Sequence, residues 1–107
     1  MPSLTKDADD LLCLIYEEYL LRLDSGQTRT QARSFDHTPE TISRCFPAVR
    51  LLDTLSELRG AGFIKKYLRD SFRLEPAGIV YMEERFPRGL SQVLEWSAKI
   101  AALFGLM

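Results

Sequence analysis

The stretch from residue 52 to residue 86, LDTLSELRGAGFIKKYLRDSFRLEPAGIVYMEERF, joins three local patterns in a fixed order. A leucine repeat of helical spacing runs into Gly60-Ala61-Gly62, where glycine permits the tight reversal that ends a helix. Two short β-like runs follow, FIKKYL and SFRLE, with a tight turn at Arg69-Asp70 between them. Pro76 then opens another helix. The stretch predicts a helix, a short β-hairpin and a second helix.

The N-terminal part of the chain predicts further helices. Apolar residues recur at three- and four-residue steps over 11–23, and Ser25-Gly26 ends this first helix. Thr28 and Gln31 have the spacing of a capping box, which begins a short second helix. Pro39, after Thr38 as cap, is predicted at the first position of a third helix that ends near Phe46.

The fourth helix, from Pro47 to Arg59, carries the strongest apolar stripe. We expect the following side chains to face inward: Val49, Leu52, Leu55 and Leu58, helped by Leu51. The outward set is then Arg50, Asp53, Thr54 and Glu57, which includes two acids.

Length and composition predict a single domain. A chain of 107 residues with 46% hydrophobic and 27% charged residues is ordinary for a soluble globular protein. The net charge is −1, but residues 25–73 hold nine basic and five acidic side chains. The N-terminus has no pattern of an export signal, so we expect a cytoplasmic protein.

Chemistry that depends on a metal, a cofactor or a nucleophile is not predicted. The two cysteines, Cys13 and Cys45, are 32 residues apart and the only histidine is His37, which does not fit a zinc site. There is no glycine-rich phosphate loop and no Ser-His-Asp or Cys-His arrangement. We therefore expect neither an enzyme nor a bound cofactor.

The order of these elements resembles the winged helix-turn-helix superfamily. The matching residues are Leu55, Leu58, Gly62, Phe63, Ile64, Leu74, Pro76, Gly78, Ile79 and Tyr81. The chain is most similar to small single-domain winged-helix proteins of bacteria and phages. The resemblance implies a mostly α fold with a small β-hairpin, a winged-helix domain over residues 1–86, and an added C-terminal helix over 87–107.

The resemblance also implies a way of binding DNA, in which the 47–59 helix enters the major groove and the hairpin touches the backbone. Arg50 and Thr54 are then the candidates for reading bases. Phosphate contacts are expected from the hairpin and from the preceding short helices: Lys65, Lys66, Arg69, Arg73, Arg29, Arg33 and Arg44. The function predicted is that of a small transcriptional regulator.

The C-terminal helix, from about Leu90 to Phe104, has a wide apolar arc. The residues that we assign to a homodimer interface are Leu90, Val93, Leu94, Trp96, Ile100, Leu103 and Phe104. The alternative is that this arc packs on the first helix of its own chain. Membrane association is not expected, since Lys99 is the only basic residue of the helix.

A second hypothesis is a winged-helix module that binds protein and not DNA. Two acids on the outward face of the 47–59 helix are unfavourable against a duplex with one charge per ~1.7 Å of its axis. If Asp53 and Glu57 are neutralised by arginines of the domain, DNA binding is favoured. If they project freely, protein binding is favoured.

Overall fold

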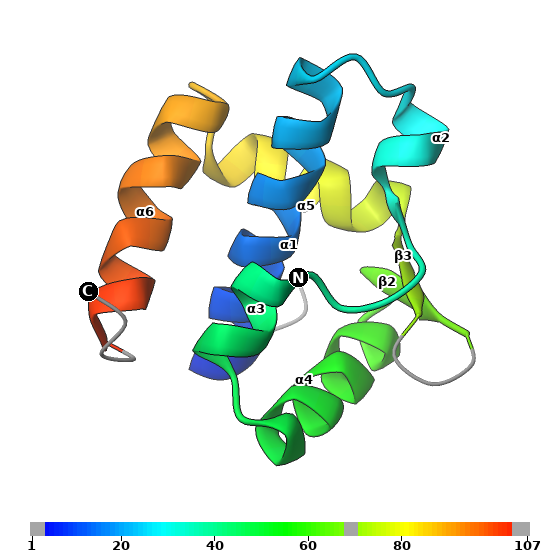
Figure 1. Cartoon of the computed structure of the whole chain (residues 1–107), viewed down its shortest axis with the longest axis vertical. Helices are drawn as coiled ribbons and strands as arrows, with labels where there is room; N and C mark the ends of the chain where they lie inside the picture. Colours follow the sequence, from blue (N-terminus) through cyan, green and yellow to red (C-terminus); the bar gives the residue numbers. More distant parts are fainter. Residues whose placement is uncertain (1–3, 68–70, 104–107) are drawn as a thin grey trace.

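The computed structural model describes residues 4–67 and 71–103, without the side chains of residues 45 and 101–103 (Figure 1). Along these residues, helices and short strands follow one another in this order: α1 Lys6–Asp24, α2 Arg29–Ala32, β1 Ser34–Phe35, α3 Glu40–Cys45, α4 Ala48–Gly60, β2 Ile64–Lys66, β3 Phe72–Leu74, α5 Pro76–Arg85 and α6 Leu90–Leu103. The chain is mostly helical, as predicted, with a small antiparallel sheet.

Helix α1 is the centre of the molecule. The hydroxyl of Thr5 accepts a hydrogen bond from the backbone N–H of Ala8, so Thr5 is the N-cap of the helix. Gly26, at φ 105°, follows the last turn. All residues from 10 to 16 are buried, because α1 is in contact with several other helices, chiefly α6 and α4. A helix covered all round has no single apolar stripe, and the buried surface is wider than the sequence pattern predicted.

The sheet has three strands in the order β1-β3-β2, and both pairings are antiparallel. The predicted hairpin is β2–β3. Strand β1 was not predicted, because two residues are too short to show the alternation that marks a strand. Phe35 of β1 lies opposite Phe72 of β3, and their rings stack with centroids 4.7 Å apart. This contact between distant segments holds β1 on the sheet.

Helices α3 and α4 each begin directly after a proline, which is one position later than predicted. Pro39 and Pro47 have ψ of 145°, which is extended backbone, so each is the N-cap and not the first helical residue.

The predicted inward face of α4 is partly wrong. Leu51, Thr54, Leu55 and Leu58 are buried, whereas Val49 and Leu52 are 77% and 50% exposed. Both stripes have helical spacing, and packing on α1 and β2 selects the one that contains Leu51.

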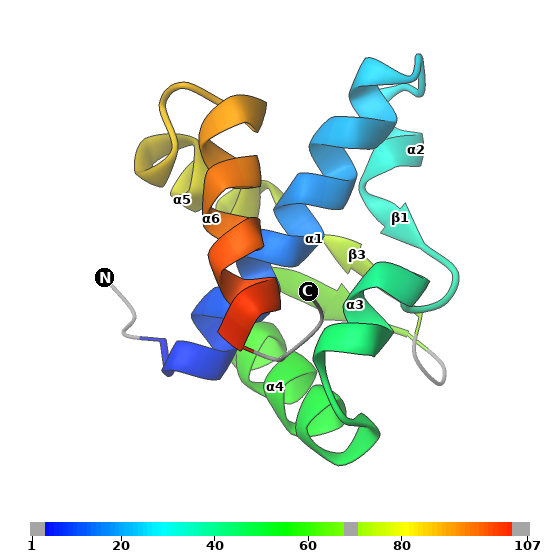
Figure 2. The same ribbon diagram turned by 60° about the vertical axis from the view of Figure 1, so that its left-hand side comes forward.

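Helices α5 and α6 complete the core. Gly78 lies against Phe63, and its lack of a side chain permits this close approach of α5. Helix α6 lies beside α1 (Figure 2), and its Val93 and Ile100 belong to the same buried core as Leu12 and Ile15. No helix among the described residues is long and apolar enough to cross a membrane.

Candidate nucleic-acid interface

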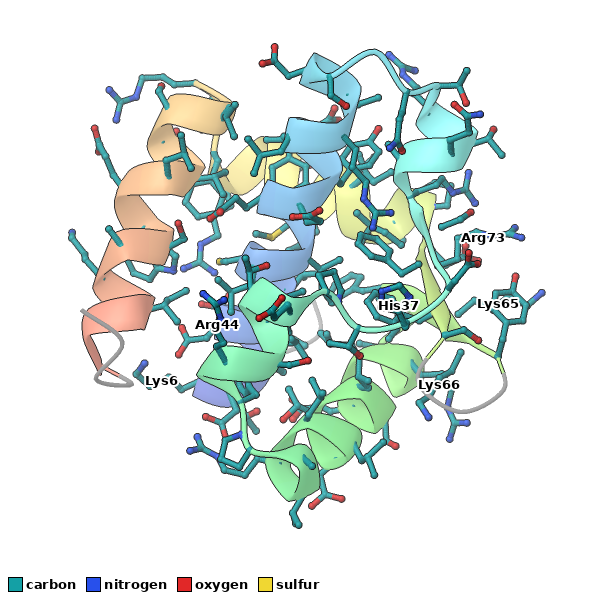
Figure 3. All side chains as sticks on the ribbon, viewed as in Figure 1. Lys6, His37, Arg44, Lys65, Lys66 and Arg73 are labelled. Carbon is teal, nitrogen blue, oxygen red and sulfur yellow. The ribbon has the colours of Figure 1, made fainter. Side chains whose placement is uncertain are left out.

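The hairpin brings two cations into direct opposition. Lys65 of β2 and Arg73 of β3 are register partners, so their side chains lie on one face of the sheet. Tyr67 lies on the same face: its ring centroid is 5.9 Å from the Lys65 amine and 5.5 Å from the Arg73 guanidinium. Figure 3 shows Lys65, Lys66 and Arg73 at the hairpin edge of the molecule. We call Lys65, Tyr67 and Arg73 the hairpin cluster.

The charges of the hairpin cluster are not balanced by the described part of the chain. Like charges directly opposite each other destabilise a strand pair. Within that part, neither Lys65 nor Arg73 forms an ion pair, and the buried Nε of Arg73 has no hydrogen-bond partner. A bound anion would relieve the repulsion and accept from Arg73. The arrangement is suited to phosphate.

The two residues predicted to read bases lie in different environments. Arg50 donates from Nη2 and Nε to the carboxylate of Asp7, at 2.5 and 3.2 Å. This bidentate pair ties α4 to the first turn of α1 and neutralises the arginine. Thr54 is buried and donates its hydroxyl to the carbonyl oxygen of Arg50 at 2.6 Å. The outward position predicted for Thr54 is wrong, because α4 turns its Leu51 stripe inward.

The other predicted phosphate contacts do not form one rim. Arg33 pairs with Glu75 at 3.3 Å and Arg44 with Glu40 at 2.9 Å. Arg29 is exposed at the start of α2. Helix α2, which begins at Arg29 and is followed by Arg33, and helix α3, with Arg44, lie on either side of β1 (Figure 2). Arg69 lies outside the described residues.

The exposed face of α4 carries apolar and acidic side chains over residues 49–57, and the exposed Arg59 lies in its last turn. Asp53 is exposed, and Glu57 accepts from the backbone N–H and the hydroxyl of Thr5 at 2.9 and 2.7 Å. Neither acid pairs with an arginine in the part of the chain described here. With Val49 and Leu52 also exposed, this face is unfavourable for the major groove.

Two of the predicted dimer residues are used inside the chain. Val93 and Ile100 are buried against α1, as the alternative interpretation of α6 expected. Trp96 packs on Phe86, and the Arg85 guanidinium lies 4.9 Å from its ring centroid. Leu90 is partly buried and Leu94 is 42% exposed. The side chain of Leu103 and the whole of Phe104 lie outside the described residues.

Thiol and metal-ligating side chains were the other candidates for a reactive site. Burial raises the pKa of the Cys13 thiol to about 12, so it stays protonated at neutral pH. Across the residues that the structure describes, no three His, Cys, Asp or Glu side chains come together to hold a metal ion.

Sequence reasoning missed the part played by the N-terminal acids. Asp7 neutralises Arg50, and Thr5 binds Glu57, so the first turn of α1 decides the electrostatics of α4. The excess of acids in residues 1–24, six against two basic residues, was the only available signal.

No model of a protein family matches this chain, and comparisons with functionally characterised proteins and with solved structures find no match either.

Proposed function

We propose that this protein is a winged-helix DNA-binding protein, acting as a small regulator, that holds the phosphates of a duplex with its hairpin. The observation that carries the proposal is the pair of cations Lys65 and Arg73, which lie directly opposite each other on β2 and β3 and form no ion pair with any described residue. The hairpin follows α4 immediately and α5 follows the hairpin, which supports the resemblance to winged-helix proteins.

The mode of binding differs from the one that the resemblance implies. Thr54 is buried and Arg50 is held by Asp7, so α4 offers neither as a base reader in this arrangement. Contacts from Lys65, Lys66 and Arg73 to phosphates carry little sequence information. The protein is therefore expected to bind duplexes of different sequence with similar affinity and with strong salt dependence.

Fluorescence anisotropy with a labelled random duplex tests this proposal at about 50 and 200 mM salt, because binding through phosphate contacts loses most of its affinity between these two concentrations. We expect micromolar binding at the lower salt. The double variant Lys65→Ala/Arg73→Ala should bind every duplex less tightly, and its salt slope should fall by about 2, one for each lost phosphate contact.

A matched control removes the same charge elsewhere. Arg88→Ala/Lys99→Ala changes two exposed cations before and on α6, away from the hairpin. This control should keep the affinity and slope of the wild-type chain. Equal losses in both double variants, or no binding by the wild-type chain at low salt, would refute binding through the hairpin.

Protein binding is a second candidate function, which the exposed face of α4 favours. Val49 and Leu52 lie beside Asp53, which is exposed and forms no ion pair with any residue that the structure describes. This combination suits a partner with apolar and basic side chains. A chain that binds no duplex, but whose Val49 and Leu52 methyl signals shift when a purified basic amphipathic peptide is added, would support this function.

A further inference from the structure

A pocket of about 330 Å³ lies between α1, α2 and α5. It is on the side of the molecule where α2 and α5 approach the C-terminal half of α1, while α4 lies at the other end of α1 (Figure 1). Its volume is at the lower end of the range of small-molecule sites in proteins. The proposed DNA contacts make no use of it.

Two helices form the apolar walls of the pocket. Leu20 and Leu23 come from α1, and Ile79 and Val80 come from α5. Positions 76, 79, 80 and 83 share one face of α5, so the wall runs along two turns of that helix. Val80 is 49% exposed, so the described residues leave this wall open to solvent.

The charged groups are at the ends of the pocket. Arg29 and Arg33 are four residues apart, and like charges at this spacing destabilise a helical turn. Arg33 is held by Glu75 at the start of α5, which places its guanidinium group at that end, and Arg29 lines the same pocket. Glu83 is two turns further along α5, about 12 Å from Glu75 at 1.5 Å per residue.

The two arginines retain capacity to bind an anion. Arg33 uses Nη2 for Glu75, and its buried Nε has no hydrogen-bond partner among the described residues. Arg29 forms no ion pair within the same set of residues. A carboxylate matches the planar geometry of a guanidinium group and accepts two hydrogen bonds from it.

We propose that this pocket binds a small monocarboxylate with an apolar body. The carboxylate contacts Arg29 and Arg33, and the hydrocarbon lies between the walls of α1 and α5. At the arginine end of the pocket, Glu75 balances Arg33 and leaves the charge of Arg29, which one negative charge balances. A nucleotide or another polyanion would meet Glu83 and Glu75 with excess charge, so the pocket favours a monoanion.

Hexanoate is the probe for this site, with hexan-1-ol as the matched neutral molecule. In a titration of the full-length protein followed by amide NMR, hexanoate should shift the signals of α2 and α5 residues and saturate in the millimolar range, as expected for eight heavy atoms at about 0.3–0.5 kcal/mol each. The affinity for hexan-1-ol should be lower by a factor of roughly ten or more, since this molecule cannot accept the charge-assisted hydrogen bonds.

Two variants locate the probe. Arg29→Gln should weaken hexanoate binding roughly tenfold, and Val80→Asp should weaken it by placing a carboxylate in the apolar wall. Both positions are exposed, so neither variant should lower the Tm much. Arg44→Gln, an exposed change on α3, should bind hexanoate like the wild-type chain.

Any one of three results would overturn the proposal. The first is that no saturable shifts occur up to about 50 mM hexanoate, which is well above the expected dissociation constant. The second is that hexan-1-ol binds as tightly as hexanoate, and the third is that both pocket variants bind hexanoate like the wild-type chain. The titration contains no DNA, so its outcome is independent of whether the hairpin binds a duplex.

Discussion

Gly78 shows how one residue determines the approach of two elements. A Cβ at this position would lie 2.6 Å from the carbonyl oxygen of Phe63 and 3.1 Å from a methyl group of Leu74. The same Phe63 oxygen accepts from the backbone N–H of Glu75 at 2.9 Å, so it cannot move away without loss of that hydrogen bond. A glycine here allows α5 to pack directly on the start of the hairpin.

The variant Gly78→Ala should therefore lower the free energy of unfolding by about 1–3 kcal/mol, the usual range for an overpacked site. Gly60→Ala is the matched control, because a Cβ on Gly60 meets no atom within 4 Å. Alanine at position 60 should be neutral or stabilise by up to about 1 kcal/mol through its helix propensity. Urea unfolding of both variants measures the difference. Equal free energies of unfolding for the two variants would show that α5 can move away from Phe63 at no cost.

Glu17 on α1 is a partly buried acid whose Oε2 atom has no hydrogen-bond partner in the described part of the chain. Burial raises the pKa of Glu17 above its ordinary value of 4.5, an effect that a hydrogen bond from Ser97 partly offsets. The native state thus holds this proton more tightly than the unfolded state. The contribution of Glu17 to stability falls as pH rises from about 4.5 through the native pKa.

Replacing the acid removes this dependence. Glu17→Gln should be more stable than the wild-type chain at pH 7, and its stability should change less between pH 4.5 and pH 7. Glu84→Gln, an exposed change on α5, is the control and should follow the wild-type curve. Urea unfolding at a series of pH values measures both. A steeper pH dependence in Glu17→Gln would contradict the sign of the shift.

At the scale of elements, α4 shows where sequence patterns become ambiguous. Its leucines and valine fit two overlapping stripes, one through Leu52 and one through Leu51, and each has helical spacing. The structure buries Leu51, Leu55 and Leu58 and exposes Leu52. This rotation also buries Thr54 and brings the apolar and acidic side chains of α4 to the surface.

Two leucine variants check the rotation of α4. Leu55 is fully buried, so Leu55→Ala should cost about 2–5 kcal/mol of unfolding free energy. Leu52 is 50% exposed, and Leu52→Ala should change stability by less than about 1 kcal/mol. Chemical denaturation of each variant measures the cost. Similar losses in both would mean that α4 is rotated toward the predicted stripe.

At the scale of the whole molecule, the homodimer remains a prediction. Val93 and Ile100 are part of the core, so a second copy would have to use Leu94 and the rest of the exposed arc of α6. A stable interface buries about 800 Å² on each partner.

Sedimentation of the wild-type chain and of Leu94→Glu tests the homodimer. The charged side chain should weaken self-association without a fall in Tm, because Leu94 is 42% exposed in one copy of the chain. Gln92→Glu, which places the same charge on another part of α6, is the control. A wild-type chain that sediments as a monomer at about 200 µM, far above the dissociation constants of specific dimers, would contradict the homodimer.

Most boundaries of helices and strands could be predicted from the sequence, because they depend on interactions between residues close together in the chain. The Thr5 cap, the capping box of Thr28 and Gln31, and the reversal at Gly62, whose φ is 80°, each depend on residues within one or two turns of each other. The hairpin and the start of α5 at Pro76 follow from the same short-range signals. A mostly helical chain with a small sheet was therefore predictable from the sequence.

Contacts between distant residues decided the rest. Strand β1 exists because Phe35 meets Phe72, 37 positions later, and the charge of Arg50 is balanced by Asp7, 43 positions earlier. The inward face of α4 and the burial of Val93 and Ile100 likewise depend on how helices pack around α1. Such pairs cannot be predicted from the spacing of residues along the chain, because each is selected by the free energy of packing and of ion pairing in the folded molecule.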